Sequence, residues 1–287
     1  MGKFHDLMDR ELRIRGYTAR TRTIYVTSVR KFVEHFGRSP DQLTLEHIKR
    51  YQLYLTRDRK ISWSWFNVQV AAIRFFYNSV LNREWEVRRI PYQRKARKLP
   101  EILSSEEVTA LFKATKNLKH RTILMTLYAG GFRISEGLHL RLSDIDSKRM
   151  VIRIDQGKGR KDRYTILSRR LLLALREYWK VHHPHPWLFP NPKTNEPLKR
   201  NSISQVIKRA KAKVGIRKQI HPHSLRHAFA THLLESGVNV LIIQRLLGHR
   251  SLRSTEIYTK VARTYLSDTR SPLDLLPDLT NVDPKKV

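Results

Sequence analysis

Apolar residues recur at helical spacing through the first part of the chain. Between Thr18 and Phe36 they follow steps of four, three, one and three, which places them on one face of a helix. Thr18 can cap the start of this helix, and Gly37 lies just past its end. A second amphipathic stretch begins at Thr44, and a third runs from about Trp63 to Leu81. The pattern predicts a bundle of three or four short helices.

The later part of the chain also has mainly helical patterning, with one exception. Ser104 and Glu107 form a capping box ahead of an apolar run, and a helix around Ile123 to Tyr128 ends at a glycine pair. The exception is a predicted β-hairpin, because Met150 to Ile154 and Arg163 to Leu167 are short, β-branched and partly alternating. Further helices are predicted at Leu171 to Trp179, Ile203 to Val214, Leu225 to Glu235 and Leu241 to Leu247. The predicted fold class is mainly α with one small antiparallel sheet.

A basic segment bounded by prolines separates the two helical regions. Residues 91–100 lack apolar periodicity and are interpreted as an interdomain linker. Its basic side chains could lie along DNA phosphates or could simply be solvated, and both interpretations stay open. They are Arg94, Lys95, Arg97 and Lys98. We therefore expect an N-terminal domain over residues 1–90, the linker, a larger domain over residues 101–270 and a C-terminal tail over residues 271–287.

Composition indicates the kind of partner. Lys and Arg number 57 against 25 Asp and Glu among 287 residues, for a formal net charge of +32 and a pI near 10.8. Such a charge suits a polyanion, and nucleic acid is the commonest one. A membrane surface is the alternative, but the sequence has no basic amphipathic anchor, lipidation signal or apolar run near the ~18 residues that span a bilayer. The polar N-terminus favours a cytoplasmic protein. The absence of cysteine excludes disulfides, thiol nucleophiles and Cys-type zinc fingers.

Several residues have the chemistry needed to cut DNA without a metal. Such a reaction needs a group to neutralise phosphate oxygens, a nucleophile, and a proton donor for the leaving oxygen. Arginine suits the first role through its planar fork, and an assisted tyrosine suits the second. The stretch His221 to His227 enters an amphipathic helix and places His223 and Arg226 at its start, where the helix dipole favours a phosphate. Tyr258 follows the glycine turn at Gly248 that closes the next helix.

Three blocks together resemble the tyrosine recombinase or phage-integrase family, with the closest similarity to its Xer-like and integron-integrase-like branches. The blocks are Leu127 to Glu136, Gly157 to Arg163, and the long stretch from His223 to Thr259. Their order and spacing fit the family over the whole second domain. The helical N-terminal region is similar to the family's core-binding, SAM-like domain. The extra insertion of a full integron integrase is missing, which favours the Xer-like branch.

The resemblance implies the roles of the residues that act on the phosphate. Arg133 and Arg226 would grip the scissile phosphate, and Tyr258 would attack it to form a 3′-phosphotyrosine. Lys158, in the turn of the hairpin, would protonate the leaving 5′ oxygen. DNA contacts are also expected from its neighbours Arg160 and Lys161.

The resemblance also implies supporting groups and an assembly. His223 would accept the proton of Tyr258, His249 would hydrogen-bond a phosphate oxygen, and Glu136 would steady the pocket. No metal, ATP or other cofactor is implied. The partner would be double-stranded DNA with a specific site, bound by four protomers that exchange strands through a Holliday junction, while the free protein would be a monomer or weaker oligomer. The apolar cluster at residues 273–276 would pack into a neighbouring protomer. Chromosome-dimer resolution, mobile-element integration and cassette insertion all stay open.

Three other functions share parts of this pattern. A DNA-binding protein without catalysis would have the same charge but no need of Tyr258. A metal-dependent nuclease or transposase would lose cleavage in a chelator, and the histidines at 221, 223, 227 and 232 invite a metal site. The chain has no HExxH pattern and few acids near them, which disfavours that site. The family resemblance implies a structural rather than a catalytic role for His227. A type IB topoisomerase would relax supercoils anywhere, whereas a recombinase should need two specific sites.

Overall fold

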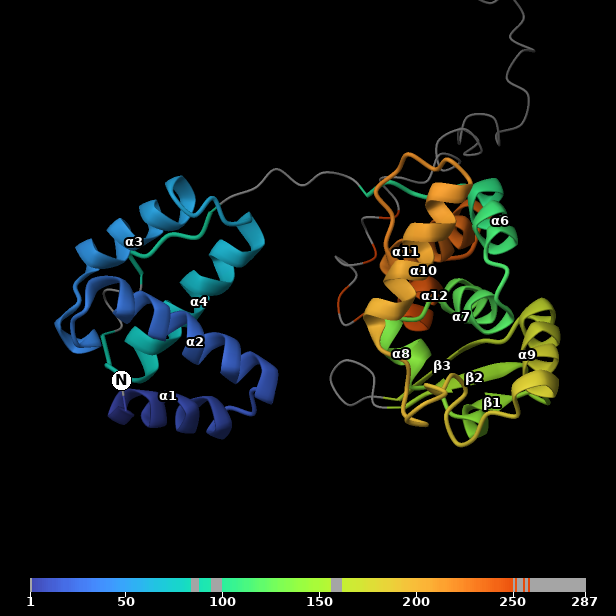
Figure 1. Cartoon of the computed structure of the whole chain (residues 1–287), viewed down its shortest axis with the longest axis horizontal. Helices are drawn as coiled ribbons and strands as arrows, with labels where there is room; N and C mark the ends of the chain where they lie inside the picture. Colours follow the sequence, from blue (N-terminus) through green and yellow to red (C-terminus); the bar gives the residue numbers. More distant parts are fainter. Residues whose placement is uncertain are drawn as a thin grey trace, which may run out of the picture. The chain divides into compact units, whose positions relative to one another are not determined.

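The computed structural model describes residues 2–83, 88–93, 100–155 and 162–249, together with Ser251, Thr255 and Tyr258. The chain divides into two compact units, Met1–Arg97 and Lys98–Val287. The units are mainly helical, and the second also contains a small antiparallel sheet, so the predicted fold class is confirmed (Figure 1).

The N-terminal unit is a bundle in which α2 and α4 pack closely against each other. Thr18 caps α2 by accepting a hydrogen bond from the backbone of Thr21, and Gly37 ends the helix in the left-handed conformation, as the sequence predicts. The helix at the N-terminus, α1, is the fourth one, which the apolar pattern did not place. The elements are α1 (Gly2–Ile14), α2 (Ala19–Phe36), the 3-10 turn η1 (Pro40–Gln42), α3 (Leu45–Arg57) and α4 (Trp63–Ser79).

The chain that follows α4 returns to its own unit. Ile90 is buried, and the carbonyl of Pro91 accepts a hydrogen bond from Gln52 Nε2 at 3.0 Å. Gln93 donates its backbone N–H to Asn67 Oδ1 at 3.0 Å. These contacts attach residues 90–93 to α3 and α4.

The second unit contains the remaining helices and the sheet. The four predicted later helices and the Ser104 cap are confirmed, but α7 begins earlier than the apolar pattern indicated, because Lys119, His120 and Arg121 interrupt that pattern in its first turn. The elements are α6 (Ser105–Ala114), α7 (Leu118–Ala129), α8 (Ile134–Leu138), the 3-10 turn η2 (Leu142–Asp144), β1 (Ile145–Asp146), β2 (Val151–Ile154), β3 (Arg163–Ile166), α9 (Arg169–His182), α10 (Arg200–Lys213), α11 (Pro222–Glu235) and α12 (Val240–Leu247).

The described strands form a sheet in the order β1-β2-β3, with both pairs antiparallel. Val151 pairs with Ile166, and Ile154 pairs with Arg163, so the predicted hairpin is confirmed. β1 has only 2 residues and shows no alternation that a sequence pattern could reveal. The sheet brings Arg163 beside the end of α12, where its Nε donates to the Leu246 carbonyl at 3.0 Å.

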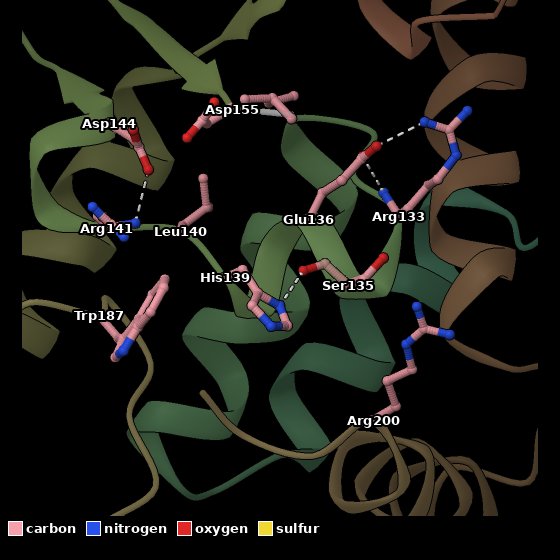
Figure 2. A pocket seen from close by; sticks show the side chains of 11 residues that line it. Arg133, Ser135, Glu136, His139, Leu140, Arg141, Asp144, Asp155, Trp187 and Arg200 are labelled. Atoms are coloured by element: carbon pink, nitrogen blue, oxygen red, sulfur yellow. Dashed lines mark hydrogen bonds and ion pairs between the residues drawn. The ribbon is translucent and has the colours of Figure 1, made fainter. Parts of the chain in front are cut away.

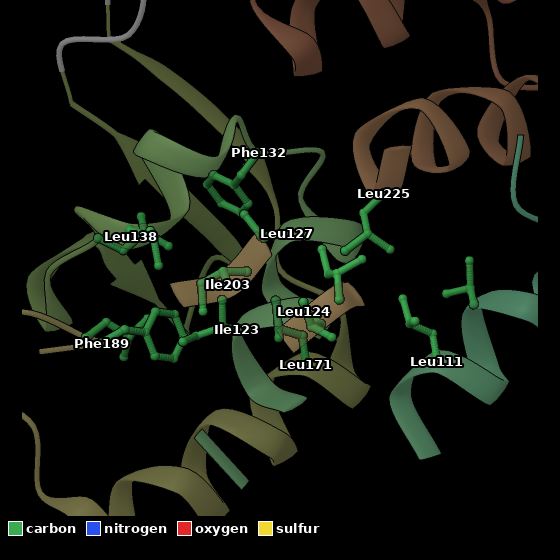
Figure 3. Packing of buried hydrophobic residues seen from close by; sticks show 14 of the residues in the cluster. Leu111, Ile123, Leu124, Leu127, Phe132, Leu138, Leu171, Phe189, Ile203 and Leu225 are labelled. Atoms are coloured by element: carbon green, nitrogen blue, oxygen red, sulfur yellow. The ribbon is translucent and has the colours of Figure 1, made fainter. Parts of the chain in front are cut away.

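Helix α11 lies between two apolar clusters. Leu225 and Ala228 belong to the main core of the unit, in which α7 packs against α9 and α11 (Figure 3). Phe229 and Leu234 belong to a second cluster with residues of α12 and with Tyr258. Because apolar contacts cover it on both sides, α11 is held firmly in place. Labelled members of the main core are Leu111, Ile123, Leu124, Leu127, Phe132, Leu138, Leu171, Phe189, Ile203 and Leu225.

Across the described residues, no helix combines the length and the apolar character that a membrane span requires.

Candidate active site

Arg226 is the largest fully buried side chain of the described residues, with 0% of its surface exposed. It lies in the first turns of α11, which begins at Pro222 after His221. Its Nη1 donates to the Gly131 carbonyl at 2.7 Å, and its Nη2 donates to the Leu247 carbonyl at 2.6 Å. Arg226 therefore connects the turn after α7 to the end of α12, while its buried Nε has no hydrogen-bond partner among the described residues.

Two glycines allow these turns to approach the arginines. Gly131 has φ +60°, and a Cβ there would lie 2.4 Å from the ring of Phe229. Gly248 has φ +62°, and a Cβ there would lie 2.7 Å from the side chain of Arg163. Since left-handed φ and lack of space both exclude larger residues, glycine is required at both turns.

Glu136 holds together the arginines of the site. Arg133 donates to this carboxylate from its backbone N–H at 2.8 Å and from Nη1 at 2.7 Å. Arg163 adds a bidentate pair at 3.1 and 2.8 Å, and Arg226 Nη1 lies 3.7 Å away. Burial raises the pKa of Glu136, but the hydrogen bonds and charges of Arg163 and Arg133 outweigh it and lower the pKa to about 2. Glu136 is thus a carboxylate at neutral pH and fixes the guanidinium groups in place.

Tyr258 is 2% exposed and packs in the second apolar cluster with Phe229 and Leu247. Its Oη lies 3.2 Å from Nδ1 of His227, within hydrogen-bond distance. Burial raises the pKa of Tyr258, whereas the positive charges of Arg226 and Arg133 act in the opposite direction. The phenol therefore lies within the electrostatic reach of both guanidinium groups.

Two other imidazoles line the site. The His223 ring packs edge to face on His227 with centroids 4.6 Å apart, and no hydrogen bond joins His223 to Tyr258 among the described residues. The ring of His249 is nearly parallel to that of Tyr258, and its Nδ1 lies 2.9 Å from Thr255 Oγ1. His249 therefore contacts the segment that carries Tyr258.

The environment keeps these imidazoles neutral at neutral pH. Burial is the largest cause and lowers the pKa of His227 and of His249 to about 4, with a further contribution from Arg226. The pKa of His223 is also lowered, by partial burial of the ring and then by the charge of Arg226, although the residue keeps an exposed face. Neutral imidazoles can accept protons, so the site contains several candidate bases.

A cavity of about 750 Å³ opens beside Arg133 and Glu136 (Figure 2). Arg141 stacks over the ring of Trp187 at 4.9 Å on its wall, and Arg200 contributes a further cation. The carboxylates of Glu136, Asp144 and Asp155 also line this cavity, so its wall carries both positive and negative side chains.

The structure brings together the sequence-predicted residues Arg133, Glu136, His223, Arg226, His249 and Tyr258. Lys158, Arg160 and Lys161 in the hairpin turn, and Arg94, Lys95, Arg97 and Lys98 in the expected linker, lie outside the described residues, as does the apolar cluster at 273–276.

Sequence reasoning missed two members of the site. Arg163 closes the second block of the resemblance but received no role, because its carboxylate partner lies on a distant element. His227 was assigned a structural role, although it contacts the phenol of Tyr258. Its position directly after Arg226 was the available signal, but spacing alone does not reveal which imidazole points at a tyrosine from another segment.

No group of three metal-binding side chains is positioned to hold a metal within the described ranges. His232, one of the histidines that suggested a metal site, is engaged elsewhere. Its Nδ1 lies 2.8 Å from Tyr128 Oη, and its Nε2 lies 2.9 Å from the carbonyl of Leu103. The ring therefore connects α7 and α11 to the chain before α6.

Residues 101–264 match the model of the phage integrase family, and residues 4–87 match that of the phage integrase N-terminal SAM-like domain. The chain belongs to the phage integrase family. This integrase is 44% identical to the putative integrase/recombinase y4qK of Sinorhizobium fredii, over 94% of this chain and 88% of that protein. It is 33% identical to the tyrosine recombinase XerA of Pyrococcus horikoshii, over 90% of this chain and 88% of XerA. The integrase is thus a site-specific tyrosine recombinase.

A solved structure shares the fold of this integrase. The post-cleavage complex of the XerH site-specific recombinase with palindromic difH substrate superposes with a TM-score of 0.74 at 21% identity. The match covers 91% of the integrase and 82% of XerH.

Proposed function

We propose that this integrase cuts and rejoins double-stranded DNA at a specific site by attack of Tyr258 on a backbone phosphate. The convergence of Tyr258, Arg133 and Arg226 in one site is the observation that carries the proposal. Burial raises the pKa of Tyr258 in the free protein, and the charges of Arg226 and Arg133 act against this rise and so favour the ionised phenol, which is the attacking form. The formal net charge of +32 supports a polyanionic partner.

The arginines would supply the charge that the transition state needs. Three guanidinium groups, from Arg133, Arg163 and Arg226, face the single carboxylate of Glu136, which leaves an excess of positive charge for a phosphate. Positioned cations of this kind stabilise the charge that develops on the phosphate oxygens. His249, beside Tyr258, would add a hydrogen bond to the same phosphate.

In the proposed reaction, Oη of Tyr258 bonds to phosphorus while the bond from phosphorus to the 5′ oxygen breaks. The products are a 3′-phosphotyrosine and a 5′-hydroxyl, with Lys158 as the proposed donor of the proton to the leaving oxygen. An imidazole accepts the phenolic proton, and the family resemblance assigns this role to His223. The phosphotyrosine bond retains the energy of the broken phosphodiester, so a second strand is joined without ATP.

The assembly would comprise four protomers on two DNA sites, with a Holliday junction between the two strand exchanges. The XerH structure was solved on its difH substrate after cleavage, which supports DNA as the partner here. The basic side chains outside the described residues, in the hairpin turn and in the expected linker, would contact the DNA backbone.

The test is covalent trapping of the full-length protein on a duplex selected by binding from a random-sequence library. Wild type in EDTA is expected to form an adduct that survives denaturing detergent, and Tyr258→Phe to form none while it still binds the duplex. Tyr164→Phe is the matched control, because Tyr164 is 56% exposed on β3 and should leave adduct formation unchanged. An adduct formed by Tyr258→Phe, or none formed by wild type on a duplex that it binds, would refute the proposal.

A second assay separates a recombinase from a topoisomerase of the same chemistry. Plasmids with two copies, one copy or no copy of the selected site are incubated with wild-type protein. We expect DNA rearrangement only with two copies, whereas relaxation of the plasmid without a site would indicate a topoisomerase.

A further inference from the structure

We propose that His227, rather than His223, accepts the proton of Tyr258 during strand cleavage and returns it during strand joining. The inference rests on the proposed function, since it requires Tyr258 to be the nucleophile. It assigns a catalytic role to a residue that sequence reasoning treated as structural.

Geometry distinguishes the two imidazoles. Nδ1 of His227 lies 3.2 Å from Oη of Tyr258, with ring centroids 5.6 Å apart. Within the described part of the chain, no other side chain hydrogen-bonds to this phenol. His223 contacts the ring of His227 and not the phenolic oxygen. A base must be within hydrogen-bond reach of the proton it removes, and His227 meets this condition.

The fold explains why His227 points at the nucleophile. Successive residues of an α-helix lie about 100° apart around its axis, so Arg226 and His227 project in different directions from α11. Arg226 projects toward the carbonyls of Gly131 and Leu247, whereas His227 projects toward Tyr258. Because α11 is packed on both sides, it positions the phosphate-binding group and the base together.

The charges around His227 favour its neutral, proton-accepting form. His223 and Arg226 face it from α11, His221 from the position just before that helix, and Tyr258 from the segment after α12. Burial and these neighbours lower the pKa of His227 to about 4 in the free protein. With the ring proton on Nε2, the lone pair of Nδ1 is available to the phenol. A bound phosphate adds negative charge nearby and raises this pKa toward the range of an effective base.

The proton is accounted for in both directions. In cleavage it passes from Oη of Tyr258 to Nδ1 of His227 as the Oη–phosphorus bond forms, the bond to the 5′ oxygen breaks, and Lys158 protonates that oxygen. In joining, the 5′-hydroxyl of the incoming strand attacks phosphorus and gives its proton to the neutral amine of Lys158. The Oη–phosphorus bond breaks, and His227 returns its proton to Oη. His223, partly exposed beside Arg226, is left to contact a phosphate oxygen.

The experiment measures the rate of adduct formation on a nicked form of the selected duplex, from which the short cleaved strand diffuses away. His227→Gln is expected to slow the reaction roughly 100-fold with unchanged DNA affinity. Its rate should rise steeply with pH, because solvent hydroxide must remove the phenolic proton. His223→Gln should keep the pH profile of wild type.

A second substrate distinguishes the role of His227 as proton acceptor from that of Lys158 as proton donor. Replacing the bridging 5′ oxygen by sulfur creates a leaving group that needs no proton donor. We expect this substrate to restore the rate of Lys158→Ala but not that of His227→Gln. A wild-type rate and pH profile for His227→Gln, or a pH-dependent loss confined to His223→Gln, overturns the proposal. Failure of wild type to form any adduct would instead refute the proposed function.

A measurement without substitution of His227 keeps the test decisive if His227→Gln does not fold. The ¹⁵N resonances of the imidazoles are compared between wild type and Tyr258→Phe in the full chain. Loss of the phenolic hydroxyl is expected to shift the Nδ1 resonance of His227, and an unchanged resonance overturns the proposal.

Discussion

Arg226 has a structural role in addition to its proposed role in binding the phosphate. Its Nη atoms bind the carbonyls of Gly131 and Leu247, so it crosslinks two turns of the second unit. Burial, and then the charge of Arg133, lower its pKa to about 10, which still leaves it protonated at neutral pH. Glu136 provides the negative charge that makes so much buried positive charge tolerable.

Removal of the carboxylate charge in Glu136→Gln is expected to destabilise the protein by about 3 kcal/mol, because the arginines that it binds would be left uncompensated. The side chain of Glu136 is 7% exposed, so solvent cannot replace these bonds. Urea unfolding at pH 7 measures the loss, with Glu177→Gln on the exposed surface of α9 as the matched control. Equal stability of the two variants would contradict the assigned role of Glu136.

The stability of wild type should fall in two pH windows. The folded pKa of His227 and His249 is about 4, below the ordinary 6.5, so the unfolded state binds protons first and stability declines as the pH falls from 6.5 toward 4. Glu136, with its pKa lowered from 4.5 to about 2, stabilises the fold above pH 4.5 and loses that effect as the pH falls toward 2. Urea midpoints across this range test both windows. In His227→Gln the decline in the upper window should be smaller, and an unchanged decline would contradict this assignment.

Among the helices and strands, the elements with local signals were predictable and those that depend on distant partners were not. Thr18 and Ser104 cap the starts of their helices through contacts within a few residues, so sequence patterns locate these starts. β1 is too short to carry a pattern. The bond between Arg163 and Glu136 joins β3 to α8, and no spacing rule predicts such a pair. The family resemblance predicted the two arginines, Glu136, His223, His249 and Tyr258 as members of one site. It did not predict which imidazole points at Tyr258, because that depends on how distant segments pack.

The turn between α7 and α8 is expected to tolerate no side chain at Gly131. Gly131→Ala combines left-handed φ with a clash against Phe229, and we expect it to cost about 3 kcal/mol. Gly215→Ala is the matched control, since its φ is +68° but the space around it is open, and it should cost about 1 kcal/mol. Urea unfolding compares them. If both cost the same, packing against Phe229 does not constrain this turn.

At the scale of the whole molecule, charge governs the encounter with DNA. A formal net charge of +32 means that binding releases many counterions from the phosphate backbone. Affinity for any duplex should therefore depend strongly on salt, whereas preference for the selected site should not.

The Tyr258→Phe protein is expected to bind DNA without reacting. For this variant, a plot of log association constant against log salt concentration should have a slope of about −5 or steeper, the value for roughly six phosphate contacts. Fluorescence anisotropy with the selected duplex measures this slope, and a scrambled duplex provides the control. A slope shallower than about −2 would mean that few phosphates are held.

The apolar cluster around Tyr258 has a consequence for the proposed covalent intermediate. Phe229, Leu234, Ile243 and Leu247 surround the phenol and leave it 2% exposed. A phosphate ester formed in such surroundings is shielded from water, the competing nucleophile that would hydrolyse it and leave a permanent break. The same apolar packing that stabilises α11 and α12 would therefore lengthen the lifetime of the attached strand until a 5′-hydroxyl arrives to reseal it.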